Sequence, residues 1–236
     1  MTESGSRDLA VAASVEALVQ LAGYPLWGIV FFGSRLVGTS PGRSSAADLF
    51  VIVRDYGAFY ERFTTAAPGR GARLLSLLNR WLPPNILAFR PGADAVGAKL
   101  FVIDRRAFLR DTGPDARDHF CRGRLCQEVE IAWAASDEAR AELQGRIDAS
   151  RWSTVEWAPM ECPPAFGVLT FCERMLARSY RAEIRPESPS RVREVFDAQR
   201  AFWVETYAPI LRMSTELVLK GEEWRTVAKP SRRRRP

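Results

Sequence analysis

The alternation of apolar runs with turn residues separates a first part of the chain rich in strands from a second part rich in helices. Two short runs, residues 25–33 and 48–53, are apolar at almost every position. Such runs are typical of strands that are buried on both faces of a sheet. Two further runs, residues 85–90 and 99–104, predict two more strands.

Helices are predicted on either side of these strands. Residues 8–22 are rich in Ala, Leu and Val and end before a glycine, and residues 70–81 end before the pair Pro83–Pro84. Proline cannot continue a helix, so both segments have a defined end. A further helix is expected to begin at residues 104–112.

From residue 114 onward the apolar positions follow the helical period instead. We expect helices over residues 114–134, 137–152, 166–183 and 191–219, the last broken near Pro209. The pattern therefore predicts an α+β protein with a mixed sheet and flanking helices in residues 1–110, a mostly helical domain in residues 111–221 and a basic tail in residues 222–236.

The composition is that of a folded protein, with 47% hydrophobic and 26% charged residues among 236. The net charge is +6, and four of the positive charges lie in the run Arg232–Arg235, so the rest of the chain is only weakly basic. Such a tail suits an anionic lipid surface or a nucleic acid, and it also suits a solvated chain end. Because no recognition motif accompanies it, we expect no nucleic-acid partner.

The cysteines and the first residues indicate a cellular location. The four cysteines form no Cys-x-x-Cys pair, and His119 is the single histidine, so a zinc site is not indicated. We interpret the cysteines as reduced thiols of a cytoplasmic protein. The first residues have no apolar signal core, and no run of 18 apolar residues occurs, so neither secretion nor a membrane span is expected.

The segment from residue 31 to residue 53 carries the clearest candidate chemistry. A buried strand ends in Gly33 and Ser34, and Asp48 begins the next strand. A Gly-Ser turn can present backbone N–H groups and a hydroxyl to a phosphate, and an acid on the following strand can hold Mg²⁺ against the same phosphates. Nucleotidyltransferases combine these elements, but with two acids, and here Ala46 occupies the first acid position. On these residues alone, Asp48 could equally be a cap or a surface residue.

Motifs further along the chain resemble one family. The segments 32–37 and 46–55 are similar to a turn and a single-acid strand of the mitochondrial-type phosphatidate cytidylyltransferases, the CDP-diacylglycerol synthases of the translocator-maintenance family. Other similarities follow in the same order between residues 27 and 212, and they are Asn85, Lys99, Gly123-Arg124-Leu125, Val129, Ser179-Tyr180, Arg185, Phe202 and Tyr207. The resemblance implies a nucleotidyltransferase-fold sheet, and it leaves open a winged-helix-like form for the helical domain.

The chain also departs from the family pattern at three places. Arg35 replaces the glycine after the Gly-Ser pair, Cys126-Gln127-Glu128 replaces a Lys-Pro segment, and Ala182-Glu183 replaces a Gly-Asp pair. The missing first acid is shared with the family and does not count as a departure. These differences bear on which substrate the protein takes, and Arg35 could add a phosphate contact.

The resemblance implies a role for each matching residue at the nucleotide. Gly33 and Ser34, with Arg35, would bind the triphosphate of CTP. Asp48 would hold Mg²⁺, and Lys99 would meet a phosphate as a point charge. Either the nucleotide supplies most of the other metal ligands, or a second acid does. The candidates are Asp55 and Glu183, each of which could instead be a surface acid.

The same resemblance implies that the acceptor is phosphatidic acid. Arg124, Tyr180 and Arg185 would line the substrate cleft, with Arg124 binding a phosphate bidentately. Their alternative roles are helix-surface or packing residues. Because phosphatidate lies in a bilayer, we expect peripheral binding of an anionic membrane surface through the basic tail.

Two other functions remain open at this point. The chain could transfer a nucleotide to another acceptor, such as a sugar phosphate, a protein or an RNA end. The sparse acids also admit a catalytically silent protein that binds a nucleotide or a lipid.

Overall fold

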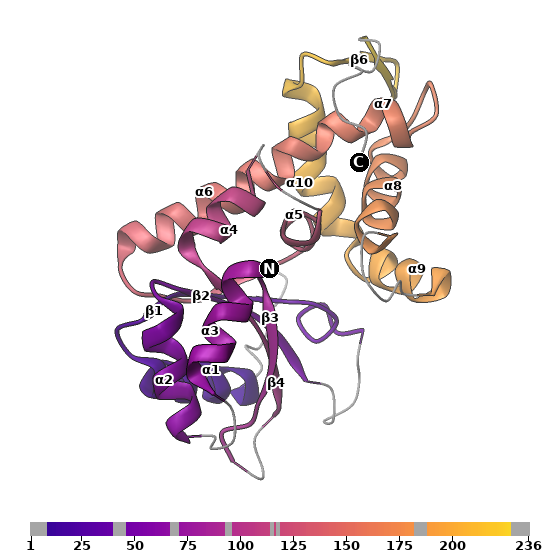
Figure 1. The fold of residues 1–236 in the computed structure, drawn as a ribbon. Helices are drawn as coiled ribbons and strands as arrows, with labels where there is room; N and C mark the ends of the chain where they lie inside the picture. The colour runs from indigo at the N-terminus through magenta and orange to yellow at the C-terminus, as the bar shows by residue number, and fades with distance from the viewer. Residues whose placement is uncertain are drawn as a thin grey trace. The chain divides into compact units, whose positions relative to one another are not determined.

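The computed structural model describes residues 9–39, 46–66, 71–92, 96–113, 116, 119–181 and 188–227. These residues form an α+β protein, as predicted, with a five-stranded mixed sheet and flanking helices followed by a mostly helical part (Figure 1). The chain packs into two compact units. One contains the described residues within 1–110 and 129–145, and the other those within 111–128 and 146–236.

The first unit is built on a sheet with the strand order β3-β4-β2-β1-β5. Its strands are β1 (Leu26–Phe32), β2 (Ala47–Val53), β3 (Asn85–Phe89), β4 (Ala98–Asp104) and β5 (Glu130–Ala134). Only β2 and β4 run parallel, and the other neighbours are antiparallel. The all-apolar runs predicted to be buried form β1 and β2, which lie at the centre of the sheet and are buried along nearly their whole length.

Helices cover both faces of this sheet. The helices α1 (Leu9–Ala22), α2 (Tyr56–Ala66) and α3 (Ala72–Trp81) lie on one side, where α1 and α2 pack on β1, β2 and β4 (Figure 1). Helix α4 (Arg105–Asp111) brings an aromatic ring against the other face. The helix α6 (Asp137–Ser153) contributes its first half to this unit and the rest to the second one.

The second unit is helical apart from one hairpin. It contains α5 (Phe120–Leu125), η1 (Thr154–Trp157), α7 (Ala158–Glu161), α8 (Val168–Arg181), α9 (Pro189–Ala198), α10 (Arg200–Met213), β6 (Leu217–Lys220) and β7 (Glu223–Thr226). Buried side chains of α8, α9 and α10 form its core with Trp157 and Trp224. The strands β6 and β7 meet at Gly221, whose φ of 65° favours glycine in this turn.

Two of the predicted helices differ from the structure in the second half of the chain. The helix predicted over residues 114–134 is wrong at its end, where β5 joins the sheet beside β1. The helix predicted over 191–219 is interrupted between α9 and α10, runs through Pro209 and ends before β6. Pro209 is exposed, so solvent can satisfy the carbonyl left without its helical donor.

The predicted tail is structured at its beginning, because residues 223–226 form β7. Residues 228–236, with the run Arg232–Arg235, lie outside the described residues. Within the part of the chain that the structure describes, no helix is both long and apolar enough to cross a bilayer.

Candidate functional site

Gly33 and Asp48 lie against each other at one end of the sheet. Asp48 pairs with Phe32 across β1 and β2, and Gly33 follows Phe32 directly. Gly33 has a φ of 88°, and a Cβ atom added there would lie 2.5 Å from Oδ2 of Asp48. A side chain at position 33 would therefore be strained and would collide with the carboxylate. The fold thus requires glycine where the Asp48 carboxylate covers the turn.

Lys99 joins this pair from the neighbouring strand. β2 and β4 run parallel with Asp48 opposite Lys99, so both side chains leave the same face of the sheet. Nζ of Lys99 lies 3.8 Å from Oδ1 of Asp48, and the two side chains are 58% and 21% exposed. A carboxylate and an ammonium group are therefore both accessible to a ligand beside the Gly33 turn.

Ser34 and Arg35 continue from Gly33 into a short turn. The N–H of Leu36 donates to the Gly33 carbonyl at 3.1 Å, and the N–H of Thr39 donates to the Ser34 carbonyl at 3.0 Å. The turn is held by its own backbone hydrogen bonds, and both side chains are only partly buried. Ser34 and Arg35, which are predicted to bind the triphosphate, thus directly follow Gly33, the residue that the Asp48 carboxylate covers.

Asp55 does not belong to this group. It follows the opposite end of β2, and the strand alone separates Asp48 from Val53 by roughly 17 Å. Oδ1 of Asp55 instead accepts a hydrogen bond of 2.8 Å from the N–H of Ala58 in the first turn of α2. Asp55 therefore caps a helix, and it lies too far from Asp48 to share a metal ion with it. Glu183, the other predicted metal ligand, lies outside the described residues.

The two predicted acceptor motifs that the structure describes pack together in the second unit. Gly123 in α5 lies so close to α8 that an added Cβ would be 2.3 Å from Oγ of Ser179. The next residues also meet, because the Arg124 guanidinium lies over the Tyr180 ring at 5.0 Å from its centroid. The Gly-Arg and Ser-Tyr pairs are thus one contact between two helices. Arg185 lies outside the described residues.

Asp48 is compatible with Mg²⁺ as a single protein ligand. Among the residues that the structure describes, no group of three or more His, Cys, Asp or Glu side chains could hold a metal ion. Mg²⁺ keeps several waters and is commonly bound by one or two carboxylates together with substrate phosphates. One partly exposed carboxylate meets that requirement, provided that a nucleotide supplies the other ligands.

Sequence reasoning missed a buried arginine network in the second unit. The Arg122 side chain is 3% exposed and donates to Glu156 at 2.9 Å, and Arg178 donates to Glu161 at 2.5 Å. Both guanidinium groups lie over the ring of Trp157, and Arg178 also contacts Nε2 of His119 at 3.2 Å. The positions of the arginines along residues 114–125 gave no indication of which of them point inward.

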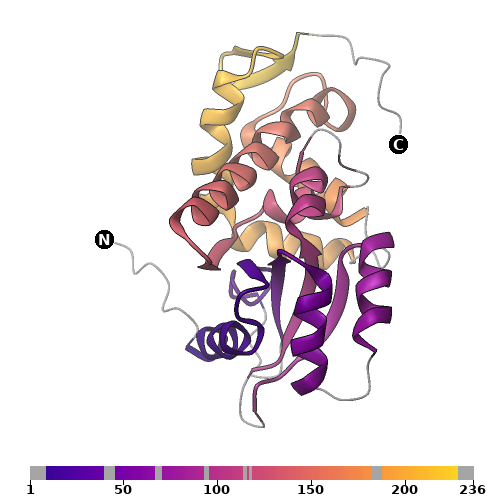
Figure 2. The same ribbon diagram turned by 60° about the vertical axis from the view of Figure 1, so that its left-hand side comes forward.

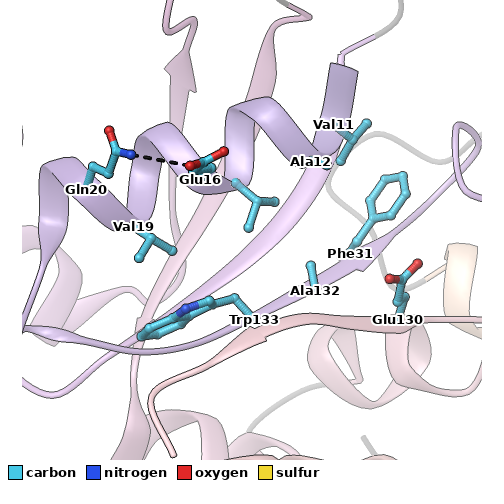
Figure 3. Close-up of a pocket in the computed structure, with 10 residues that line it drawn as sticks. Val11, Ala12, Glu16, Val19, Gln20, Phe31, Glu130, Ala132 and Trp133 are labelled. Atoms are coloured by element: carbon cyan, nitrogen blue, oxygen red, sulfur yellow. Dashed lines mark hydrogen bonds between the residues drawn. The ribbon is translucent and has the colours of Figure 1, made fainter. Parts of the chain in front are cut away.

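A groove of about 410 Å³ lies between α1 and β5 in the first unit (Figure 3). Its walls are mostly apolar and carry two carboxylates, Glu16 and Glu130. Glu130 pairs with Phe31, whose side chain leaves the sheet on the face opposite to that of Phe32 and Asp48. The groove is therefore separate from the Asp48 group. It was not foreseen because β5 was expected to be helical.

Comparisons with models of protein families and with curated proteins find no match for this chain.

Proposed function

We propose that the protein transfers the cytidylyl group of CTP to phosphatidate and releases pyrophosphate. The observation that carries this proposal is the group at the end of β1. Asp48 covers the Gly33 turn, and Lys99 extends from the parallel strand beside it. A glycine turn, one carboxylate and one ammonium group close together would suit a metal-bound phosphate chain.

In the proposed reaction a phosphate oxygen of phosphatidate attacks the α-phosphorus of CTP. A new P–O bond forms while the bond from the α-phosphorus to the bridging oxygen breaks, and the electron pair leaves with pyrophosphate. The protein contributes by holding both phosphates in line and by neutralising charge. Gly33 admits the triphosphate close to the backbone, and Ser34 and Arg35 bind its oxygens.

Asp48 and Lys99 have different roles at the triphosphate. Asp48 would hold Mg²⁺, which supplies charge neutralisation at the triphosphate. Lys99 exchanges its long contact with Asp48 for a phosphate oxygen when the nucleotide binds. The accessible Lys99 side chain supports this role, because a buried ion pair would resist such an exchange.

The acceptor is assigned to the α5–α8 contact in the second unit. Arg124 is held over the ring of Tyr180, which restricts the guanidinium group. A restricted guanidinium is suited to bidentate binding of a lipid phosphate. Arg185 and Glu183 keep their predicted roles in acceptor and metal binding. The proposed setting is a cytoplasmic protein bound peripherally to an anionic membrane.

The experiment is transfer of label from cytidine-labelled CTP to phosphatidate in the presence of Mg²⁺. The wild type should form a lipid-soluble product, and Asp48→Asn should lose at least about 10²-fold in rate. Asp55→Asn is the matched control, because it makes the same substitution at the other end of β2 and asparagine also caps helices. Equal losses in the two variants would remove Asp48 from the mechanism.

The same assay distinguishes the other functions. Label transferred to a sugar phosphate, a protein or RNA, with none in phosphatidate, would indicate a nucleotidyltransferase with another acceptor. CTP binding without turnover in any of these mixtures would indicate a silent binding protein. If a chain that ends at residue 228 still binds anionic vesicles, the basic tail is not needed for membrane binding.

A further inference from the structure

Helix α3 exposes its apolar side. Leu74, Leu77, Leu78 and Trp81 occupy positions i, i+3, i+4 and i+7, and together they form one stripe along the helix. Their exposed fractions run from 44% at Leu78 to 74% at Trp81. An amphipathic helix of a globular protein normally turns such a stripe inward, so the exposure of this stripe to solvent is unusual.

The buried side of α3 carries Ser76 and Asn79 beside the partly buried Ala72 and Leu75, and hydrogen bonds fix Asn79 there. Asn79 is fully buried, and its Nδ2 donates to the carbonyl of Val102 in β4 at 2.8 Å. The Tyr60 hydroxyl of α2 donates to Oδ1 of the same Asn79. Because a buried amide without partners is costly, these bonds specify which side of the helix faces the sheet. The helix lies beside α2 (Figure 2).

The apolar surface continues past the end of the helix. Leu82 is 75% exposed, and Ile86 of the edge strand β3 is 61% exposed. Ile86 pairs with Phe101, whose ring lies on the face of the sheet that α4 covers, so Ile86 lies on the face opposite to α3 and does not extend this surface. We call Leu74, Leu77, Leu78, Trp81 and Leu82 the α3 surface.

The charges beside the α3 surface are mainly positive. Helix α3 has arginines at positions 73 and 80 and no acidic residue. Both arginines line a shallow groove of about 340 Å³ against α2, together with Glu61 and Ser76. Two guanidinium groups against one carboxylate leave this groove with a net positive charge. Apolar residues including tryptophan beside arginines are the composition of helices that lie in the headgroup region of a bilayer.

We propose that the α3 surface docks on an anionic bilayer, with the leucines and Trp81 inserted at the headgroup boundary and Arg73 and Arg80 on lipid phosphates. A ten-residue helix is about 15 Å long, too short to span but long enough to lie in the interface. The choice of a lipid surface over a protein rests on this charge complementarity, and in part on the proposed function, whose acceptor lies in a membrane.

The first test is flotation of the full chain with vesicles, without nucleotide. The wild type should float with vesicles of phosphatidylcholine and phosphatidylserine, and it should bind only weakly to vesicles of phosphatidylcholine alone. The double variant Leu77→Ser with Trp81→Ser should lose at least about tenfold in the bound fraction. The matched control is Trp152→Ser with Leu219→Ser, which removes one tryptophan and one leucine that are exposed elsewhere and should leave binding unchanged. Arg73→Gln with Arg80→Gln should reduce binding to the anionic vesicles only.

The second test follows Trp81 directly. Brominated lipids in the same anionic vesicles should quench the tryptophan emission of the wild type, and Trp81→Phe should abolish most of that quenching while Trp152→Phe keeps it. Equal binding by all the variants, or quenching that survives Trp81→Phe, would overturn the proposal. So would light scattering that shows a wild-type dimer dissociated by the Leu77 and Trp81 substitutions, because the surface would then join two copies of the chain.

The proposed function is tested separately, with a short-chain phosphatidate that dissolves in water. Transfer to this acceptor should be the same in the wild type and in the Leu77 and Trp81 double variant. If transfer occurs and flotation fails, the docking surface is wrong and the function stands. If flotation succeeds and no transfer occurs, the function is wrong and the docking surface stands.

Discussion

At the scale of single residues, Gly33 determines how close the backbone comes to the carboxylate of Asp48. Gly33→Ala introduces both an unfavourable φ and a collision, whereas Gly38→Ala introduces only the φ, because no atom lies within 4 Å of its added Cβ. We expect both variants to lose about 1–2 kcal/mol in unfolding free energy from the backbone. Gly33→Ala alone should also lose affinity for Mg²⁺ and CTP.

Denaturant unfolding and titration calorimetry separate these two effects for Gly33 and Gly38. The calorimetry compares the variants with the wild type at equal folded fractions. If both variants keep wild-type affinity, the contact between position 33 and Asp48 has no part in binding the nucleotide.

Glu161 makes the second unit sensitive to acid. Burial alone would raise the pKa of Glu161, but hydrogen bonds and charges from Arg178 and Arg181 outweigh it and hold that pKa below its ordinary value. A lowered pKa in the folded state stabilises the fold above the ordinary pKa of 4.5, and this contribution is lost as the pH falls through the folded pKa.

We therefore expect Glu161→Gln to lower the unfolding free energy on the order of 1–2 kcal/mol at neutral pH and much less in acid. Thermal unfolding of both proteins across the acid range measures the difference. Glu205→Gln at an exposed position of α10 is the control and should be neutral throughout. A Glu161→Gln loss that stays constant down to the lowest pH would show that the carboxylate acts through packing.

At the scale of elements, Asp55 belongs to the start of α2 and not to the site. Asp55→Ala should lower the unfolding free energy by about 1 kcal/mol, because the N–H of Ala58 loses its acceptor. The same substitution should leave Mg²⁺-dependent CTP binding unchanged. Denaturant unfolding measures the loss of stability, and calorimetry with MgCTP measures the binding. A loss of binding larger than the unfolded fraction explains would mean that Asp55 belongs to the site.

Elements whose neighbours are close in sequence were the predictable ones. The apolar runs of β1 and β2 are typical of strands buried on both faces, and the Gly33 turn and Asp48 lie directly beside them in the sequence. β5 could not be predicted in this way, because its five residues are all half-buried and its partner β1 lies about a hundred positions earlier. The pairing of β5 with β1 is a long-range contact, and it prevails over the helical spacing of the apolar residues in this segment.

Helix α3 was predicted at the right place, but its orientation was not predictable. Its apolar stripe would normally be assigned to the core. The deciding interaction is Asn79 with Val102 and Tyr60, which connects three elements. Hydrogen bonds between distant elements leave no periodic signal in the sequence, so the exposed stripe appears only in the structure.

At the scale of the whole molecule, two separate hydrophobic cores predict two regions of independent stability. One core contains the fully buried Phe59 with residues of α1, β1, β2 and β4, and the other contains Phe171 with residues of α8, α9 and α10. Phe59→Leu and Phe171→Leu each remove part of one buried ring. We expect each to cost about 1–2 kcal/mol, and only in its own unit.

Hydrogen exchange measured on peptides tests this expectation. Phe59→Leu should accelerate exchange in α1, α2 and β1, and Phe171→Leu should accelerate it in α8 and α10. Peptides from the two halves of α6 provide the finest test, because this one helix belongs to both units. Its first half should respond only to Phe59→Leu and its second half only to Phe171→Leu. Uniform acceleration along α6 in either variant would mean that the two cores unfold together.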